Sequence, residues 1–439
     1  PLRVGATPEQ RRRWLGRVAN EGLIVAYGVT EPEAGSNVAA LKTVAVPERD
    51  GDRVVAYRLT GTKQFISNGA VADLYTILAQ APGGPSFFVV ERGTPGLAPG
   101  RMEVKHGIRS SNTSQVILDD VRIPADQLIG GVEGKGLEHA NEVFGFTRVM
   151  VAAFGLGGGE AGLVRAIAYS KERKQFGKLL CQLKGFTHKL LLPHVVRLEA
   201  ARAFIEEVTR RLDSGEKGLQ TEGSIAKLYA TEAGNAAADA AIQAHGGYGY
   251  TREYVVEKIK RDVRITTIYE GTSEIQQSII YLFRFRQVVR SKGGFYTVPA
   301  QELRGLGPEV AADLVADTAQ ALAHTLLKFH ELKISREQNV MFELADRITE
   351  VEHAMAFCRK AAGAGPELRA ACRVFAAEAA SRLAASGLRI LAASGADAVA
   401  VTEYREAIKA ERLLAPAAGS FTDMACVVEW LLAEWPRLG

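Results

Sequence analysis

Residues 261–276 read RDVRITTIYEGTSEIQ and carry the most informative local signal in the chain. Ser273 and Gln276 have the spacing of a capping box, which predicts that a helix begins at about Ser273. Glu270 then lies in the loop before that helix, and the glycine after it permits a sharp turn. A carboxylate in such a loop can enter a cleft, where apolar neighbours raise its pKa toward that of a general base. Taken alone, the stretch also fits a solvated or capping carboxylate.

Two further segments upstream of this loop have ligand-binding character. Residues 243–250 read QAHGGYGY, and three glycines at a helix end suit either close approach of the backbone to a ligand or a simple helix C-cap. His245 within this segment is more typical of a structural histidine than of a catalyst. Residues 172–178 read ERKQFGK, in which Arg173 fits either a basic helix end or a clamp for a pyrophosphate.

The chain from about residue 23 to 128 alternates short β-rich runs with turn signals. The predicted strands are Leu23–Val29, Arg53–Leu59, Leu74–Ala79, Phe87–Glu91 and Val116–Ile123. Together they predict a compact antiparallel β domain. The first strand leads into residues 27–36, YGVTEPEAGS, whose hydroxyls and backbone N–H groups fit either a ligand-binding turn or a plain strand-ending loop.

From about residue 133 the apolar residues follow a helical period instead of the β-rich pattern. The predicted helices cover 134–156, 160–174, 183–213, 220–244, 252–261 and 273–291, in addition to a short one at 8–21. Gly293, Gly294 and Pro299 then predict a linker. Beyond the linker, apolar residues fall on one helical face, so residues 307–437 are predicted to form a separate bundle. The residues of that face are Phe342, Ala345, Ile348, Val351 and Met355.

Residues 157–162, GGGEAG, match the GxGxxG pattern of dinucleotide-binding loops. The pattern needs a strand before the glycines and an acidic residue about twenty positions later, and this sequence has neither. We therefore interpret these glycines as small residues at which two helices pack closely.

The composition excludes several classes of protein. The 439 residues are 47% hydrophobic and 24% charged, which is typical of a globular chain of two to four domains. A net charge of +4 is too small to indicate nucleic-acid binding. The four widely spaced cysteines predict neither a zinc site nor a disulfide framework, and no other metal site is indicated. The apolar runs are interrupted by Arg or Gly, so no membrane-spanning helix is predicted.

Seven segments in order resemble the acyl-CoA dehydrogenase family of flavoproteins. They are YGVTEPEAGSNVA, GTKQFISNGA, IRSSNTSQVILDDVRIP, FTR, ERKQFGK, QAHGGYGY and RDVRITTIYEGTSEIQ. The match extends over about residues 8–290. It implies an α+β, acyl-CoA dehydrogenase-like fold, in which an antiparallel β domain is followed by a four-helix-bundle domain and an extra C-terminal helical bundle. Such a C-terminal extension resembles that of the longer, very-long-chain-type members.

The resemblance divides the chain into five parts. Residues 1–22 match the last helix of an N-terminal helical domain that is mostly absent, residues 23–130 the middle β domain, and residues 131–292 the helical FAD and acyl-CoA domain. Residues 293–306 are then a linker and residues 307–439 an additional C-terminal helical domain, which the resemblance links to peripheral membrane association. The implied location is the cytoplasm of a bacterium, or alternatively the mitochondrial matrix or inner-membrane surface.

The resemblance also implies a reaction, the FAD-dependent dehydrogenation of an acyl-CoA thioester to a trans-2-enoyl-CoA. Glu270 matches the catalytic base that removes the α-proton, while the β-hydrogen leaves as hydride to flavin N5. The electrons would pass to an electron-transfer flavoprotein, and the protein would form a homodimer or homotetramer. The alternatives are an acyl-CoA oxidase that uses dioxygen, a flavin-bearing relative that binds nucleic acid, and a non-catalytic subunit. The near-neutral charge disfavours the nucleic-acid reading, and the retained Glu270 argues against the last.

The resemblance finally implies a set of ligand contacts. The residues implied to contact FAD are Tyr27, Val29, Thr30, Ser36, Phe65, Ile66, Ser67, Arg173, Gln175, Gln243, Gly246, Gly247, Gly271, Thr272 and Ser273. Those implied to contact acyl-CoA are Ser36, Thr147, Arg148 and Tyr269. Ser67 has the position whose hydroxyl bonds flavin N5. The FAD contacts at Arg173, Gln175, Gln243, Gly246 and Gly247 match residues that reach the FAD of a neighbouring subunit.

Overall fold

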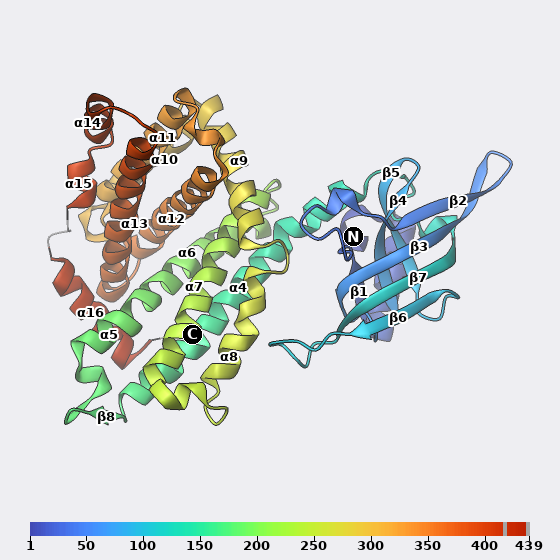
Figure 1. The fold of residues 1–439 in the computed structure, drawn as a ribbon, viewed down its shortest axis with the longest axis horizontal. Helices are drawn as coiled ribbons and strands as arrows, with labels where there is room; N and C mark the ends of the chain where they lie inside the picture. Colours follow the sequence, from blue (N-terminus) through green and yellow to red (C-terminus); the bar gives the residue numbers. More distant parts are fainter. Residues whose placement is uncertain (416–418, 436–439) are drawn as a thin grey trace. The chain divides into compact units, whose positions relative to one another are not determined.

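A computed structural model describes residues 1–415 and 419–435 of the chain. The chain divides into two compact units, Pro1–Phe144 and Gly145–Gly439. The first unit contains a β-sheet and the second is helical (Figure 1). The predicted α+β class, with a β domain followed by helical domains, is confirmed. The boundary between the units lies within a long helix rather than at residue 130, and residues 1–22 belong to the first unit.

Seven strands form the sheet of the first unit, in the order β1-β4-β2-β3-β7-β6 with β5 paired to β4. Their bounds are β1 Val25–Gly28, β2 Val44–Asp50, β3 Arg53–Ser67, β4 Leu74–Ala81, β5 Gly84–Glu91, β6 Leu97–Met102 and β7 Thr113–Pro124. Most neighbouring strands are antiparallel, as predicted. The exceptions are β1 and β2, which both run parallel to β4.

The sequence pattern missed two of these strands, β2 and β6. Ala45 is the one fully buried residue of β2, and β6 has none. Each strand also contains a proline, Pro47 in β2 and Pro99 in β6. β6 ends the strand order, where a proline is tolerated because an edge strand has N–H positions that no neighbour requires. Strands with so little buried surface lack the alternation by which a strand is recognised.

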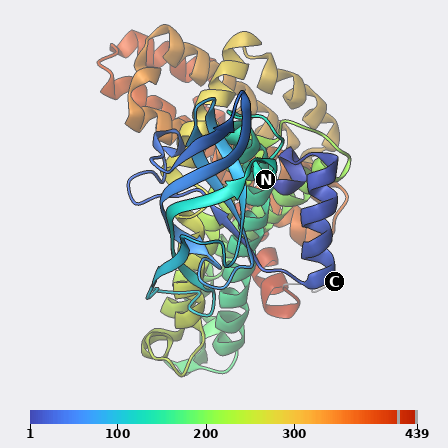
Figure 2. The ribbon, with the colours of Figure 1, turned by 90° about the vertical axis from the view of Figure 1, so that its right-hand side faces the viewer.

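The sheet has an apolar core on both faces. Ile77 of β4 packs with residues of β3, β5 and β7, whereas its neighbour Leu78 packs with Trp14, because successive side chains of a strand point to opposite faces. Trp14 is fully buried and belongs to the N-terminal helical segment beside the sheet (Figure 2). The predicted helix 8–21 is in fact three short pieces, α2 (Pro8–Gln10), a π-helical turn (Arg11–Leu15) and α3 (Gly16–Glu21), preceded by α1 (Leu2–Gly5).

Helices make up nearly all of the second unit. Their bounds are α4 Gly136–Ser170, α5 Lys184–Leu190, α6 Leu192–Asp213, α7 Gln220–His245, α8 Val256–Val263, α9 Ser273–Arg290, α10 Gly294–Leu303, α11 Ala312–Glu331, α12 Gln338–Ala362, α13 Pro366–Ala393, α14 Ala398–Ala407, α15 Ala410–Leu414 and α16 Ser420–Ala433. A two-stranded ribbon, β8 (Lys174–Gln175) and β9 (Lys178–Leu179), follows α4. The predicted helix 183–213 is divided into α5 and α6 at Leu191, just before Pro193.

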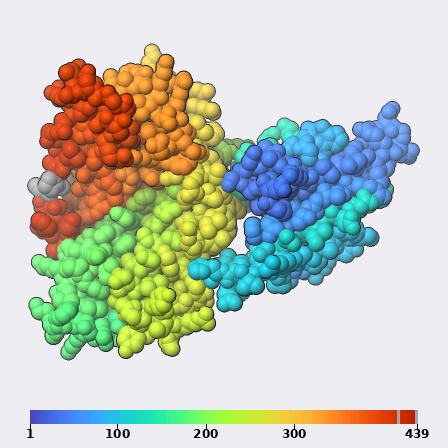
Figure 3. Space-filling model, in the orientation of Figure 1, coloured from blue at the N-terminus to red at the C-terminus, as the bar shows by residue number. Residues whose placement is uncertain are grey.

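The C-terminal helices are not a separate bundle, contrary to the prediction. A single apolar core extends from Val149 of α4 to Trp435, and α12 packs against both α6 and α9. In the space-filling view the C-terminal helices lie directly against α6, α7 and α9, without an intervening gap (Figure 3). The predicted linker 293–306 is also wrong, because most of it is helix α10 with buried Tyr296 and Leu303. Gly293 precedes that helix with a φ of +89°, so the glycine signal marks its start rather than a flexible connection.

The glycines of the GxGxxG-like segment lie where α4 packs against α7, which confirms the helix-packing interpretation. A Cβ at Gly159 would lie 2.8 Å from the Cα of Gly234, and one at Gly162 would lie 3.3 Å from the Cα of Ala238. The small residues recur every three or four positions and therefore lie on one face of α4, which packs against α7. α4 is one continuous helix where two helices, 134–156 and 160–174, were predicted.

We expect Gly234→Ala to lower the free energy of unfolding by about 1–3 kcal/mol, because its methyl group would collide with the carbonyl oxygen of Gly155 and force α4 and α7 apart. Gly157→Ala is the matched control. It lies in α4 with no atom within 4 Å of an added Cβ, so we expect it to raise stability by up to about 1 kcal/mol. Denaturant unfolding measures both variants, and equal effects would contradict the packing described.

Helix α4 also revises the expectation about membranes. By length and composition alone its 35 residues include a window apolar enough to cross a bilayer, contrary to the prediction. Half of that window is buried inside the protein, where Val149, Ala152 and Leu163 belong to the helical core. α4 therefore has the features of a core helix whose valines, leucines and alanines raise its mean hydropathy.

Candidate active site

The loop before α9 is a tight turn with an unusual backbone. Glu270 has a φ of +57° and Gly271 a φ of +90°. Thr272 caps α9, because its hydroxyl accepts a hydrogen bond from the N–H of Ile275. The predicted start of α9 at Ser273 is confirmed, but Gln276 does not complete a capping box. Its side-chain amide instead donates to the carbonyl oxygens of Glu270 and Gly271, at 3.0 Å each.

The Glu270 carboxyl lies in a cluster of polar groups within the second unit. Its Oε2 accepts a hydrogen bond of 2.9 Å from the hydroxyl of Thr147 on α4. Burial raises the pKa of Glu270, while Thr147, Arg148 and Lys227 act in the opposite direction and favour the carboxylate. Burial together with the Glu270 charge raises the pKa of Tyr269 to about 12. The structure thus brings four of the predicted residues together, namely Glu270, Thr147, Arg148 and Tyr269.

A backbone donor accompanies this carboxyl. Within residues 1–415 and 419–435, the N–H of Glu270 has no hydrogen-bond acceptor. The same residue therefore presents an acceptor on its side chain and a donor on its main chain. A donor of this kind can stabilise negative charge that develops on a carbonyl oxygen, and the carboxylate can take a proton from the neighbouring carbon.

A second group of predicted residues lines a pocket of about 640 Å³ at the end of α7. The predicted members are Arg173, Gln175, Gln243, Gly246 and Gly247, and the sequence did not single out Tyr169, Phe186 and Tyr248 beside them. The guanidinium of Arg173 lies 5.8 Å from the centre of the Tyr248 ring. His245 is a buried structural residue, as predicted, since its Nδ1 lies 2.7 Å from the carbonyl of Ala241 and its ring stacks on Tyr169.

Apart from Gly271, Thr272 and Ser273 at the start of α9, the remaining predicted residues belong to the first unit. The turn after β1 is joined to the end of β3, because the N–H of Gln64 donates to the carbonyl of Thr30 at 2.8 Å. Phe65 follows with a φ of +59° and a side chain that is 63% exposed. The predicted contacts in these two segments are Tyr27, Val29, Thr30, Ser36, Phe65, Ile66 and Ser67, of which Ser36 and Ser67 are exposed whereas Val29 and Ile66 are buried.

A buried ion pair that the sequence did not reveal supports the first of these turns. Lys63 has no exposed surface, and its Nζ donates to Glu31 at 2.6 Å and to the carbonyl of Val29 at 3.2 Å. Glu31 also accepts from the N–H groups of Lys42 and Thr43. The pair therefore holds the turn in place through buried contacts.

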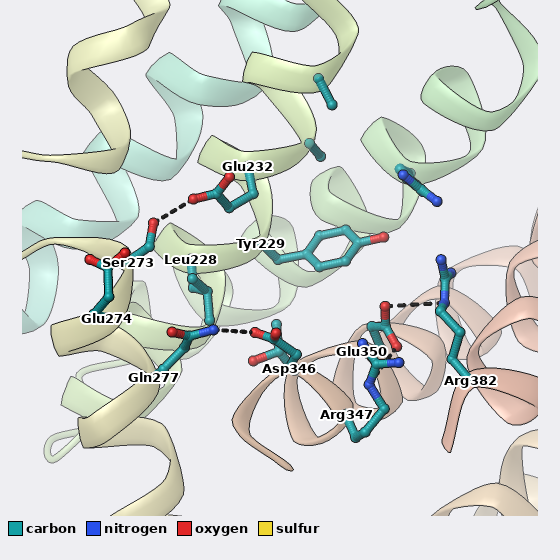
Figure 4. Close-up of a pocket in the computed structure, with 14 residues that line it drawn as sticks. Leu228, Tyr229, Glu232, Ser273, Glu274, Gln277, Asp346, Arg347, Glu350 and Arg382 are labelled. Carbon is teal, nitrogen blue, oxygen red and sulfur yellow. Dashed lines mark hydrogen bonds and ion pairs between the residues drawn. The ribbon is translucent and has the colours of Figure 1, made fainter. Parts of the chain in front are cut away.

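A cavity of about 450 Å³ lies between helices α7 and α9 and the C-terminal helices α12 and α13. Glu232 and Ser273 point toward one another, as do Gln277 and Asp346 (Figure 4). The Ser273 hydroxyl donates to Glu232 at 2.5 Å, and the Gln277 amide donates to Asp346 at 2.8 Å. The start of α9 is therefore held by α7 and by the C-terminal helices together.

Two family models match the chain, and together they cover more than half of it. The acyl-CoA dehydrogenase middle domain matches residues 26–121, and the acyl-CoA dehydrogenase C-terminal domain matches residues 134–282. Cyclohexane-1-carbonyl-CoA dehydrogenase of Geobacter metallireducens is 38% identical over 284 residues, which are 64% of this chain and 73% of that protein.

Solved structures share the fold. An acyl-CoA dehydrogenase complexed with FAD from Bacillus anthracis has a TM-score of 0.84 at 23% identity, over 98% of this chain and 79% of that one. A chain in the structure of the electron transferring flavoprotein of Acidaminococcus fermentans has a TM-score of 0.60 at 34% identity, over 64% of this chain and 73% of that one. The first of these shares the C-terminal helices as well. On these matches, the chain belongs to the acyl-CoA dehydrogenase family, whose members are oxidoreductases acting on CH–CH bonds.

Proposed function

We propose that this protein is an FAD-dependent acyl-CoA dehydrogenase in which Glu270 is the catalytic base. The observation that carries the proposal is the Glu270 turn, where a half-buried carboxyl of raised pKa lies on the same residue as a backbone N–H that has no acceptor among the described residues. The N–H would donate a hydrogen bond to the thioester carbonyl oxygen of an acyl-CoA and so acidify the α-carbon. The carboxylate of Glu270 would then take the α-proton.

The residues present fit FAD. Arg173 offers a guanidinium for a pyrophosphate, and the aromatic and glycine walls of the same pocket suit a flat adenine ring. The exposed turn at Phe65–Ser67 offers a backbone and a hydroxyl to the flavin ring. When bound, FAD supplies an acceptor for the hydride that leaves the β-carbon. Following the family resemblance, the Arg173 pocket would hold the FAD of a second copy, so we propose a homodimer or homotetramer.

The acyl-CoA class of substrate is supported by the dehydrogenase from Geobacter metallireducens, which is named for a cyclic acyl-CoA. We further propose an electron-transfer flavoprotein as the electron acceptor, supported by the match to a chain in the Acidaminococcus fermentans structure.

Anaerobic mixing of the purified holoprotein with acyl-CoA thioesters, from short to very long and including branched ones, tests the proposal. Bleaching of the bound flavin by at least one thioester is expected, and no bleaching across the series would contradict the assigned chemistry. Turnover that needs an added electron-transfer flavoprotein supports the proposed acceptor. Hydrogen peroxide release in its absence would instead make the protein an oxidase.

The pH dependence of the reaction follows from the pKa of Glu270. The base acts only when deprotonated, so kcat/KM should be constant at high pH and fall as the pH drops through the raised pKa. Thr147→Val removes a hydrogen bond that favours the carboxylate, so its acid limb should move to higher pH. Thr209→Val on α6 is the control, because the Thr209 hydroxyl bonds only backbone carbonyls of its own helix. An acid limb that Thr147→Val leaves in place would exclude Glu270 as the group that titrates.

A further inference from the structure

Helix α7 contains a lysine with no exposed surface, Lys227. Lysine is almost never fully buried unless its ammonium is paired. Within the described residues, this ammonium donates one hydrogen bond, to the carbonyl oxygen of Gly271 at 2.7 Å. Burial lowers the pKa of Lys227 to about 8, with Arg148 acting in the same direction and Glu232, Glu270 and Glu274 against it. A buried cation thus donates its hydrogen bond to a backbone carbonyl directly beside the proposed base.

The turn that receives this hydrogen bond is one that the backbone does not adopt readily. A non-glycine residue with positive φ, such as Glu270, persists only where its surroundings hold it. Two side chains from different helices provide that hold. Gln276 of α9 donates to the carbonyls of Glu270 and Gly271, and Lys227 of α7 donates to the carbonyl of Gly271.

We propose that Lys227 is a positioning residue for Glu270, which by holding the Gly271 carbonyl fixes both the carboxylate and the backbone N–H of the base. The proposal rests on the function proposed above. The Gly271 carbonyl belongs to the Gly271–Thr272 peptide and is separated from the Cα of Glu270 by one peptide unit, so its release loosens the backbone of Gly271 that orients that intervening unit. Carboxylate and N–H would then leave their positions together, and a displacement of about 1 Å at a reacting group can cost about 10²-fold in rate.

Lys227→Met tests this role, because methionine fills much of the volume of lysine but has neither donor nor charge. The matched control is Lys260→Met. Lys260 also donates to a backbone carbonyl, that of Asn235 at 2.9 Å, but it lies on α8 and does not contact the Glu270 turn. We expect kcat for flavin reduction to fall about 10- to 100-fold in Lys227→Met. KM, flavin content and melting temperature should stay close to those of the Lys260→Met variant.

A second readout separates positioning from a purely structural role. The Lys227 charge favours the ionised form of Glu270, so its removal should raise the pKa of the base. The acid limb of kcat/KM is therefore expected at higher pH in Lys227→Met and unmoved in Lys260→Met. A general loss of folded enzyme would lower the rate at every pH and leave the limb in place.

Several results would overturn the proposal. A kcat in Lys227→Met equal to that of the Lys260→Met variant, or a lower kcat with an unmoved acid limb, overturns the proposal. If Lys227→Met fails to retain FAD, Gln276→Met takes its place, because it removes the other side-chain donor to the Gly271 carbonyl. A normal kcat in Gln276→Met would overturn the claim that hydrogen bonds to this carbonyl position Glu270. Activity in a Glu270→Gln variant would contradict the proposed function itself. If Glu270→Gln is inactive while Lys227→Met is fully active, only the proposed role of Lys227 is contradicted.

Discussion

Glu270→Gln is expected to lower the rate of flavin reduction by acyl-CoA about 10²- to 10⁴-fold while FAD remains bound. Glutamine keeps the shape of the side chain and can still accept the hydrogen bond from Thr147, but it cannot take a proton. Since the backbone N–H of residue 270 is retained, binding of the thioester should persist. The substitution therefore removes the proton-transfer step alone.

The same variant should be at least as stable as the wild type at neutral pH. Burial raises the pKa of Glu270, so the folded protein pays to keep this carboxyl ionised above its pKa, and a neutral amide avoids that cost. Loss of activity without loss of stability is the combination that a catalytic carboxylate predicts.

Rapid-mixing measurement of flavin bleaching under anaerobic conditions, with melting temperature and flavin content in parallel, tests both expectations. Glu274→Gln is the control, because Glu274 lies on the exposed side of α9 only four residues away. Glu274→Gln should bleach at a rate close to the wild type. Rapid bleaching in Glu270→Gln would show that another group takes the proton.

The local sequence around Glu270 predicted the loop and the helix start, because both depend on residues within a few positions of one another. It could not identify the donors that hold the turn. Lys227 precedes Glu270 by 43 residues and is one of several polar residues along the alanine-rich helix α7. Only the packing of α7 against the turn shows which group this lysine contacts.

Glycine and proline misled the prediction where tertiary packing outweighs local preference. Gly293, Gly294 and Pro299 read as a linker, yet α10 forms around them because Tyr296 and Leu303 are buried on one side. In α4 a break was predicted between residues 156 and 160, but the helix is continuous there, and Gly155, Gly159 and Gly162 contact α7. Such residues have two meanings, and only a neighbouring element decides between them.

Glu352→Ala is expected to lower the free energy of unfolding by about 3–5 kcal/mol, the largest stability effect that we predict. Glu352 of α12 accepts two hydrogen bonds from the guanidinium of Arg284 on α9, at 2.6 and 3.0 Å, and one of 2.8 Å from the hydroxyl of Tyr296 on α10. The side chain of Arg284 is 3% exposed. Truncation of Glu352 would leave this cation in the core with Glu222 of α7 as its remaining carboxylate, at 3.1 Å.

The control is Glu411→Ala, which removes the partner of Arg405 from an exposed ion pair of 3.0 Å and should change stability by less than about 1 kcal/mol. A double variant, Arg284→Met with Glu352→Met, should recover part of the loss, because it removes the buried cation as well, while Glu222 keeps Arg211 at 3.4 Å as its partner.

The shape of the unfolding transition tests whether the C-terminal helices share one core with α6, α7 and α9. Arg284 lies on α9, two residues beyond the end of the family-model match at residue 282, whereas Glu352 belongs to the C-terminal helices that follow α9. If those helices form one core with α6, α7 and α9, Glu352→Ala should shift the loss of bound flavin and the loss of helical signal to the same lower denaturant concentration. If they were an independent bundle, the helical signal would fall in two steps and the flavin would be released at the wild-type midpoint. That second pattern would contradict the single core and restore the boundary that the glycines at 293–294 suggest.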